Sequence, residues 1–331
     1  MRARRSLTVV GCHAGGEVGN VVVAGVDPPS GATVFEQMQA LQRDDSLRRF
    51  LLREPRGSVA THANLIVPAT REDCAFGFII MEPTEYPVMS GSNTICVATV
   101  LLETGRVAMH EPETTLRLEA PAGVIEIRAA CRDGRVESVE LTNVPSFAAR
   151  LGAPLEVDGL GTITVDIAFG GMWYAIADAA ELGFAIEPHE ARALCDVGER
   201  IRLAAKAQID PRVSIVQIAE PWQGVGRVTK NAVVIAPGRL DRSATGTGLS
   251  ARMAVLHARG LMNVGDAMTH ASAIGSTFDG RIVAQTETGI VPAIRGSAFI
   301  TGLAELYVDP DDPFPEGYLL SDTWPGDDVQ H

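Results

Sequence analysis

Two short stretches of the chain place hydroxyl side chains and a glycine at the start of an apolar helical pattern. The first is Ser90-Gly-Ser, and the second, Thr245-Gly-Thr, begins 155 positions later. The N–H groups at a helix start have no partner within the helix, and the helix dipole favours an anion there. Two such starts could hold one small carboxylate or phosphate between them. Their hydroxyls would suit removal of a proton from one face of a carbon and its delivery to the other.

Serine and threonine are also common helix N-caps, so either stretch alone could have only a structural role. The constant spacing continues to the glycine that ends each helical pattern, Gly105 in the first copy and Gly260 in the second. A duplicated strand–turn–helix unit explains this spacing and favours two similar halves with the active site in the cleft between them. An old duplication would leave the same spacing without activity, so the repeat does not separate the two roles.

The two helical patterns are apolar nearly all round, which predicts helices that are buried. Neighbouring segments such as 114–119 and 124–130 alternate with the period of two that is typical of strands. We therefore predict an α+β fold in which each half is a curved, mostly antiparallel sheet around a central helix. We place the first half at residues 1–145, with residues 300–331 packing back on it, and the second half at residues 146–299. The Pro- and Gly-bearing stretch 143–154 is expected to cross between the halves.

The composition restricts the classes of partner and location. A chain of 331 residues exceeds the usual span of one hydrophobic core, and its formal charge of −13 argues against a nucleic-acid partner. No apolar stretch approaches the ~20 residues of a membrane span. The five cysteines are scattered without CxxC spacing, so a reducing cytoplasm is the simpler location. We find neither metal-ligand spacing nor a dinucleotide fingerprint, and we predict no metal, no cofactor, and a monomer or homodimer.

Several motifs resemble those of the proline racemase family, and they follow the family's order along nearly the whole chain. Met89-Ser-Gly-Ser and Asp241-Arg-Ser-Ala-Thr-Gly-Thr-Gly resemble its two active-site motifs. The other matching segments are 13–17, 54–57, 170–174, 296–302 and 309–316. The resemblance implies the diaminopimelate-epimerase-like fold, with two pseudo-symmetric halves, and cofactor-independent chemistry on proline or hydroxyproline.

By this resemblance Ser90 and Thr245 occupy the two catalytic positions. Racemases and 4-hydroxyproline epimerases usually carry two cysteines there, and trans-3-hydroxy-L-proline dehydratases carry threonine at the second position. The resemblance also implies a set of residues that bind a small imino acid substrate, through backbone N–H groups on its carboxylate and an aspartate on its ring nitrogen. These residues are Gly91, Ser92, Asp241, Gly246 and Thr247.

Replacement of both thiols by hydroxyls changes the expected chemistry. A thiolate is a credible carbon base near neutral pH, whereas a hydroxyl needs a neighbouring base. Dehydration needs only one competent base, so we predict a trans-3-hydroxy-L-proline dehydratase that forms a pyrroline-2-carboxylate. Ser90 would remove the α-proton, and Thr245 would orient or assist the leaving hydroxyl. The alternatives are a 4-hydroxyproline 2-epimerase and a family member that only binds a small imino acid.

The group that would activate Ser90 is not evident from the chain. His13, Glu17 and Asp241 are candidates by family position, and His13 is a further candidate site residue because it lies in a Gly-rich turn. We interpret the other histidines near the predicted elements, His62 among them, as structural or surface residues. Cys96, six positions after Ser90 in a buried helix, is interpreted as a small core residue.

Overall fold

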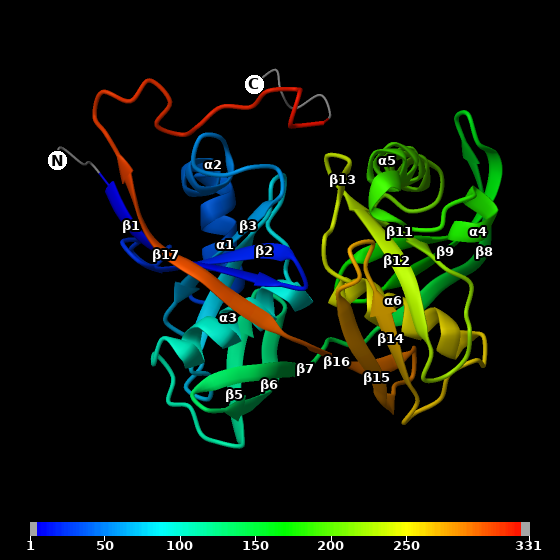
Figure 1. The fold of residues 1–331 in the computed structure, drawn as a ribbon, viewed down its shortest axis with the longest axis horizontal. Helices are drawn as coiled ribbons and strands as arrows, with labels where there is room; N and C mark the ends of the chain where they lie inside the picture. Colours follow the sequence, from blue (N-terminus) through cyan, green and yellow to red (C-terminus); the bar gives the residue numbers. More distant parts are fainter. Residues whose placement is uncertain (1–4, 326–331) are drawn as a thin grey trace. The chain divides into compact units, whose positions relative to one another are not determined.

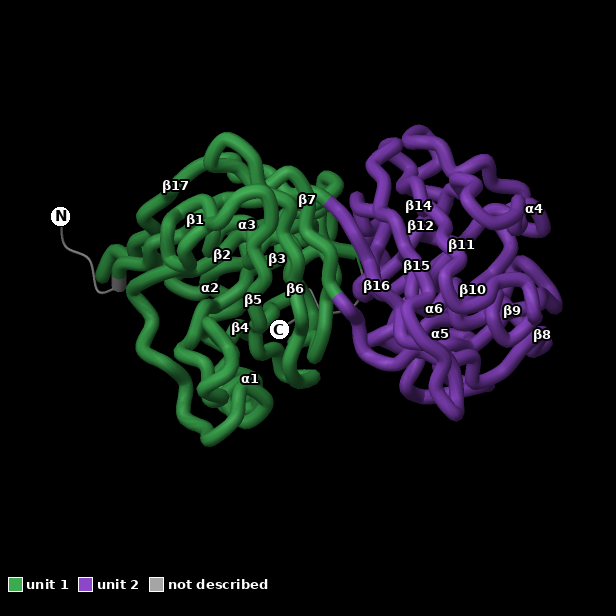
Figure 2. The backbone as a smooth tube through the Cα atoms, turned by 90° about the horizontal axis from the view of Figure 1, so that it is seen from below, with its two compact units in different colours: residues 1–141, 297–331 green, residues 142–296 purple. Residues whose placement is uncertain are grey.

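The computed structural model describes residues 5–325, which form two compact units (Figure 2). Unit 1 extends to Leu141 and resumes at Ser297, and unit 2 is Thr142–Gly296. The chain therefore passes from one unit to the other twice. Among the described residues, no helix has the length and apolar character that crossing a membrane would require.

Unit 1 is an α+β unit. Its strands are β1 (Arg5–Ala14), β2 (Glu17–Ala24), β3 (Thr61–Val67), β4 (Phe76–Met81), β5 (Glu113–Ala120), β6 (Gly123–Arg132), β7 (Arg135–Thr142) and β17 (Ala298–Val308). Its helices are α1 (Val34–Arg43), α2 (Ser46–Leu52) and α3 (Gly91–Glu103). Most neighbouring strands pair antiparallel, while β2 pairs parallel with β3 and β4 pairs parallel with β5.

Unit 2 repeats this order. Its strands are β8 (Phe147–Val157), β9 (Gly161–Phe169), β10 (Trp173–Asp178), β11 (Ile215–Ala219), β12 (Val228–Ile235), β13 (Arg239–Leu240), β14 (Ala267–Ala271), β15 (Thr277–Gln285) and β16 (Ile290–Gly296). Its helices are α4 (Ala179–Leu182), the 3₁₀ turn η1 (Pro188–Glu190), α5 (Ala191–Gln208) and α6 (Gly246–Ala258). Counted from β9 and without the two-residue strand β13, the parallel pairs fall at the same positions as in unit 1. Here β10 pairs with β11, and β12 pairs with β14.

The two sequence repeats exchange one strand each. The last strand of the chain, β17, pairs antiparallel with the first, β1, and Figure 1 shows them side by side in orange and blue. In unit 2 the corresponding place beside β9 is taken by β8, which follows β7 in the sequence. The stretch expected to be only a crossing thus continues into a strand. Each sheet is completed by a strand from the other sequence repeat.

The two helices of the repeat are α3 and α6, and they start 155 residues apart, at Gly91 and Gly246. Residues 91–102 of α3 are all buried, and α6 is buried along most of its length. An apolar surface around the whole helix requires this placement, because no side of the helix is suited to water. The predicted α+β architecture with one buried central helix in each half is confirmed.

Candidate active site

Ser90 precedes α3, but its side chain does not cap the helix. The described residues provide no hydrogen bond from an α3 amide to the Ser90 hydroxyl. Instead, Asn93 Nδ2 donates to Ser90 Oγ over 2.9 Å, and Ser92 Oγ lies 3.5 Å from the same oxygen. The first backbone bond that returns to the cap runs from Thr94 N to Ser90 O. The side chain of Ser90 therefore does not have the structural role of a helix N-cap.

The orientation of the Asn93 amide is set by its neighbours. Asn64 Nδ2 donates to Asn93 Oδ1 over 2.8 Å and to the carbonyl oxygen of Asn20 over 3.3 Å. The Asn93 amino group must then face Ser90 Oγ and, 3.1 Å away, His62 Nδ1. Because His62 Nδ1 accepts this bond, a neutral His62 ring carries its proton on Nε2.

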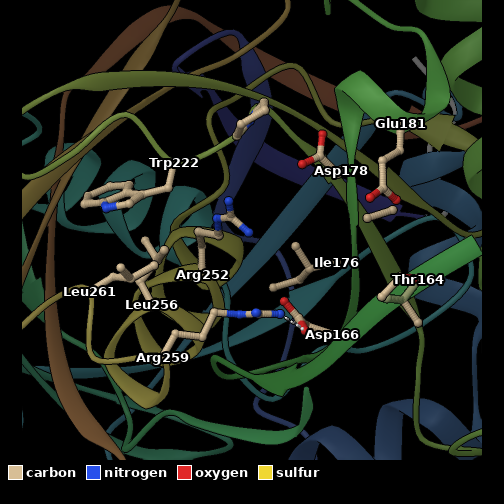
Figure 3. A pocket seen from close by; sticks show the side chains of 13 residues that line it. Thr164, Asp166, Ile176, Asp178, Glu181, Trp222, Arg252, Leu256, Arg259 and Leu261 are labelled. Atoms are coloured by element: carbon tan, nitrogen blue, oxygen red, sulfur yellow. Dashed lines mark hydrogen bonds and ion pairs between the residues drawn. The ribbon is translucent and has the colours of Figure 1, made fainter. Parts of the chain in front are cut away.

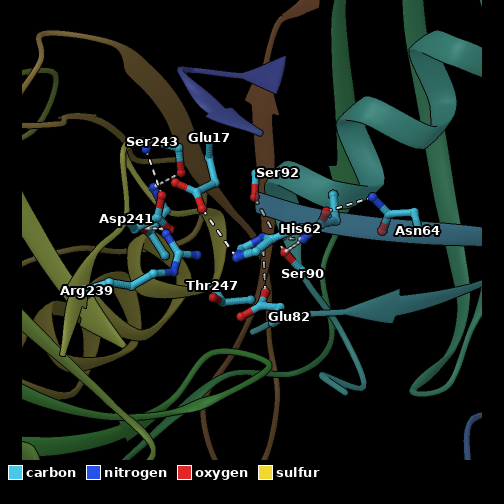
Figure 4. A network of polar contacts seen from close by, with 12 residues as sticks. Glu17, His62, Asn64, Glu82, Ser90, Ser92, Arg239, Asp241, Ser243 and Thr247 are labelled. Carbon is cyan, nitrogen blue, oxygen red and sulfur yellow. Dashed lines mark hydrogen bonds and ion pairs between the residues drawn. The ribbon is translucent and has the colours of Figure 1, made fainter. Parts of the chain in front are cut away.

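His62 lies between two carboxylates of unit 1. Its Nε2 is 3.3 Å from Glu17 Oε1, and its Nδ1 is 3.5 Å from Glu82 Oε1 (Figure 4). His62 is only 2% exposed, so it is not a surface residue. It belongs instead to a buried polar network that reaches the Ser90 hydroxyl through Asn93. A polar pair at alternate positions of the apolar strand β3, His62 and Asn64, was the signal for this network in the sequence.

Of the suggested activators in unit 1, Glu17 is part of this network, whereas His13 has a different set of contacts. His13 Nδ1 accepts a hydrogen bond from the N–H of Gly16, 3.2 Å away, within its own turn. The His13 ring also lies 5.6 Å from the ring of Phe299, centroid to centroid. His13 therefore stabilises the β1–β2 turn that carries Glu17.

In unit 2, Thr245 precedes α6 with a strained backbone. Its φ of 57° lies in the left-handed region, which a β-branched residue rarely adopts and which costs on the order of 1–3 kcal/mol. Its side chain does not cap α6 within the described residues. Thr245 Oγ1 donates to Asp241 Oδ2 over 2.9 Å. Asp241 Oδ1 accepts from the N–H of Ser243 over 2.7 Å (Figure 4). In this backbone conformation the Thr245 hydroxyl lies against the Asp241 carboxylate.

The first turn of α6 carries two more of the candidate residues, Gly246 and Thr247. Thr247 Oγ1 lies 2.6 Å from the hydroxyl of the buried Tyr174 on β10, so this hydroxyl has a partner within unit 2. The first backbone bond that returns to the cap runs from Leu249 N to Thr245 O. As in α3, the earlier amides of the turn are not used by the helix itself, and they are suited to a carboxylate.

These clusters can be compared with known proteins. Residues 9–319 match the family model described as Proline racemase. The chain belongs to the proline racemase family. A hydroxyproline epimerase from Agrobacterium vitis with bound trans-4-OH-L-proline is 37% identical, with a TM-score of 0.92 and 98% of each chain covered. A probable proline racemase from Agrobacterium radiobacter K84 with bound carbonate is 38% identical, with a TM-score of 0.90 over 97% of this chain and 98% of that one.

More distant structures share the fold of this proline racemase family member. A PhzF-family phenazine biosynthesis protein of Bacillus anthracis is 10% identical, with a TM-score of 0.61 over 92% of this chain and 100% of that one. A predicted epimerase from Pseudomonas aeruginosa is 16% identical, with a TM-score of 0.58 over 91% and 99% of the two chains. The predicted diaminopimelate-epimerase-like fold is confirmed.

This member of the proline racemase family has Ser90 and Thr245, and not cysteines, at the two positions that we predict to be catalytic, and the nearby Cys96 does not supply a thiol there. Cys96 is fully buried in α3 beside Cys12. Burial, followed by the contact with Cys12, raises the pKa of the Cys96 thiol well above its ordinary value. Cys96 is therefore a protonated core residue, and its thiol is not suited to act as a base.

A buried histidine near α6 leads to a prediction on stability. His270 is 0% exposed on β14, and burial, followed by the nearby charge of Arg252, lowers its pKa to about 3. Between an unfolded pKa of about 6.5 and this folded pKa, only the unfolded chain takes up the proton. His270 should therefore make the free energy of unfolding fall as pH drops from about 6.5, by up to ~1.4 kcal/mol per pH unit.

The measurement is urea unfolding at pH 7 and pH 5. The loss of stability between these pH values should be smaller in His270→Gln than in the wild type. Replacement of the exposed His189 by glutamine should leave this loss unchanged. An equal loss in His270→Gln and the wild type would contradict the burial of a neutral imidazole.

Proposed function

We propose that this proline racemase family enzyme dehydrates trans-3-hydroxy-L-proline, with Thr245 and Asp241 as its acid–base pair. The supporting observation is that the two hydroxyls have different partners. Thr245 donates its proton to the carboxylate of Asp241, whereas Ser90 accepts a hydrogen bond from the amide of Asn93. A hydroxyl beside a carboxylate can pass its proton on as it takes another, and a hydroxyl beside an amide N–H cannot. The site thus has one activated hydroxyl, and Thr245 is favoured over Ser90 as the base.

One activated hydroxyl is sufficient for this dehydration. In trans-3-hydroxy-L-proline the α-hydrogen and the 3-hydroxyl lie on the same ring face, since the hydroxyl is opposite the carboxylate. Thr245 would take the α-proton while its own proton moves to Asp241. Thr245 would then give a proton to the departing hydroxyl, which leaves as water, and would take its own proton back from Asp241. The carbon–oxygen bond breaks as the Cα–C3 double bond forms, and the enamine tautomerises to a pyrroline-2-carboxylate.

We further propose that Ser90 and the first turns of the two central helices also bind the substrate, as the family resemblance implies. The amides at the starts of α3 and α6 would hold the substrate carboxylate and stabilise the charge that develops on it. The residues assigned to this role are Gly91, Ser92, Gly246 and Thr247. Ser90, oriented by Asn93, would then position the ring rather than remove its proton.

Epimerisation of a 4-hydroxyproline is the second candidate. It is supported by the 37% identity to the Agrobacterium vitis epimerase, which holds trans-4-OH-L-proline. Inversion at Cα needs an acid–base group on each face, so Ser90 would have to exchange protons as well. Its contact with an amide rather than a carboxylate makes this the weaker proposal.

One assay separates the candidates. Purified protein is incubated in D₂O with trans-3-hydroxy-L-proline, trans-4-hydroxy-L-proline or L-proline, and the α-proton signal is followed by NMR. Loss of the 3-hydroxy substrate to a pyrroline product supports dehydration, and inversion with α-deuterium in the 4-hydroxy substrate supports the epimerase. No turnover of any of the three, with a thermal shift on binding, would leave only an imino acid binding protein.

The hydroxyls of Ser90 and Thr245 can be replaced by thiols through mutation to cysteine. In the Ser90→Cys/Thr245→Cys double variant, thiols at two helix starts should ionise more readily than the hydroxyls they replace. We expect α-deuterium to enter recovered trans-4-hydroxy-L-proline at least about tenfold faster than in the wild type, since proton transfer by a matched base contributes about 10²–10⁴-fold. The Ser90→Cys single variant is the control. A folded double variant that is no faster than the wild type would count against the assignment of these two positions.

A further inference from the structure

Unit 2 contains a cavity of about 350 Å³ that shares no lining residue with the Thr245–Asp241 cluster. Its walls come from β9, β10, α4, α6 and the segment at Pro221 and Trp222 (Figure 3). The volume is at the lower end of the ~300–1,000 Å³ that is usual for small-molecule sites. A compact metabolite fits such a space better than a cofactor or a peptide.

The cavity is distinguished by an arginine with few partners. Arg252 comes from α6, and its only hydrogen bond within the described residues is a long one, 3.3 Å from NH2 to the carbonyl oxygen of Glu220. Burial is the main cause that lowers the pKa of its guanidinium. Its neighbour Arg259, in contrast, forms an ion pair with Asp166 over 2.6 Å. The charges of Asp166 and Asp178 offset part of the lowering of the Arg252 pKa, but within the described residues neither carboxylate is hydrogen-bonded to Arg252. The remaining donors of this poorly solvated guanidinium are suited to a ligand carboxylate.

The opposite side of the cavity is acidic. Asp178 uses Oδ1 to cap α4, accepting from the N–H of Ala180 over 2.7 Å, and Glu181 follows in the same helix with an exposed side chain. Figure 3 shows the Asp178 carboxylate and the Arg252 guanidinium directed toward the same space, with Trp222 on the other side of the arginine. An ammonium group would therefore find negative charge in the cavity.

The lining charges select against a ligand of either single sign. Beyond the Arg259–Asp166 ion pair, the charged groups that line the cavity are the guanidinium of Arg252 and the carboxylates of Asp178 and Glu181. An anion alone would be repelled by the carboxylates, and a cation alone would leave Arg252 unpaired. The apolar part of a ligand would contact the remaining walls. These include Ile176, Leu256, Leu261, Pro221 and Trp222.

We propose that this cavity is an accessory site for a small zwitterionic amino or imino acid. The ligand carboxylate contacts Arg252, and the ligand ammonium lies toward Asp178 and Glu181. The proposal goes beyond the proposed function and holds for any reaction at the Thr245 cluster. Trp222 provides a reporter that belongs to this cavity alone.

The experiment uses the full chain labelled with 5-fluorotryptophan and followed by fluorine NMR. The chain has three tryptophans, and Trp222→Phe identifies the signal of Trp222. The probes are L-alanine and L-proline as zwitterions, with acetate and methylammonium as single charges. We expect the Trp222 signal to shift saturably with a zwitterion and not with either single charge at the same concentration.

Variants test the assigned contacts. Arg252→Gln should raise the Kd of the zwitterion at least about tenfold, because a hydrogen bond to a charged group is lost. Arg227→Gln, at an exposed arginine of the same unit, should leave the Kd unchanged. If Arg252→Gln does not fold, Glu181→Gln at an exposed position should still weaken binding severalfold. A Trp222 signal that no zwitterion moves, or equal shifts in the wild type and in the folded variants, overturns the proposal.

Discussion

Replacing Asp241 with asparagine is expected to lower kcat about a thousandfold, within the ~10²–10⁴ that a positioned acid–base group contributes. Asp241 Oδ2 accepts the Thr245 hydroxyl proton over 2.9 Å, so in the proposed function this carboxylate would allow Thr245 to act as a base. Asparagine keeps an oxygen for the N–H of Ser243 but presents an amide N–H to Thr245. The Thr245 hydroxyl would then accept instead of donate. NMR turnover of the best substrate gives kcat and KM.

The two kinetic constants separate catalysis from binding at Asp241. If Asp241 only holds the ring nitrogen, KM should rise while kcat changes little. Asp309→Asn is a matched control, because Asp309 also accepts from the N–H two residues ahead, Asp311 N at 2.9 Å, on an exposed segment. That control should retain full activity, and both variants should keep the wild-type circular dichroism spectrum. A folded Asp241→Asn enzyme with wild-type kcat would refute the acid–base role.

Ser90→Ala is expected to lower kcat, whereas Thr33→Ala is expected to lower stability and leave kcat unchanged. Thr33 is a true N-cap of α1, since its Oγ1 accepts from the N–H of Glu36 over 3.1 Å, and its loss should cost ~1 kcal/mol of stability with unchanged kcat. Ser90 makes no such bond. In the proposed function its hydroxyl, which accepts a hydrogen bond from Asn93, positions the substrate ring, so its loss should lower kcat on the order of a hundredfold through misplacement of the ring.

The kcat of Ser90→Ala and Thr33→Ala is measured by NMR turnover, and their stability is measured by urea unfolding of the same preparations. Ser90→Gly adds a further comparison, because glycine replaces a serine cap at a cost of only a few tenths of a kcal/mol. If Ser90 were merely a cap, Ser90→Gly would be nearly as active as the wild type. Activity within about twofold of the wild type in both Ser90 variants would therefore return Ser90 to a structural role.

Most of the architecture follows from local patterns. The starts of α3 and α6 could be predicted to within one residue, because a hydroxyl–glycine turn precedes an apolar run in both copies. The strand β8 was harder to recognise, since Gly152 and Pro154 interrupt it and much of it is exposed. The C-terminal segment was expected to pack back on the first half, but the pairing of β17 with β1 and of β8 with β9 could not be predicted, because a period of two identifies a strand but not its partner.

The candidate site was only partly visible in the sequence for a similar reason. Ser90, Thr245 and Asp241 lie in short motifs that can be compared directly with a family. The network of His62 and Asn93 depends on β3 packing against α3, and nothing in the local sequence of either element states that contact. The sequence signal for Arg252 is that it is the single charged residue within the buried helix α6. Its place in a cavity could be recognised only from the structure.

The exchanged strands have a consequence for the origin of the chain. A half-length protein ending after β8 would leave the β1 edge, now paired with β17 from Arg5 to Ala14, open to other strands. It would also carry β8, a strand whose partner, β9, lies in the other repeat. Two copies could cover each other's edges by swapping these strands, so we infer a domain-swapped homodimer as the ancestor. Fusion of its two subunits would give the present order of strands along the chain. Two separately produced halves of the present chain should regain the native strand pairing only when they are mixed.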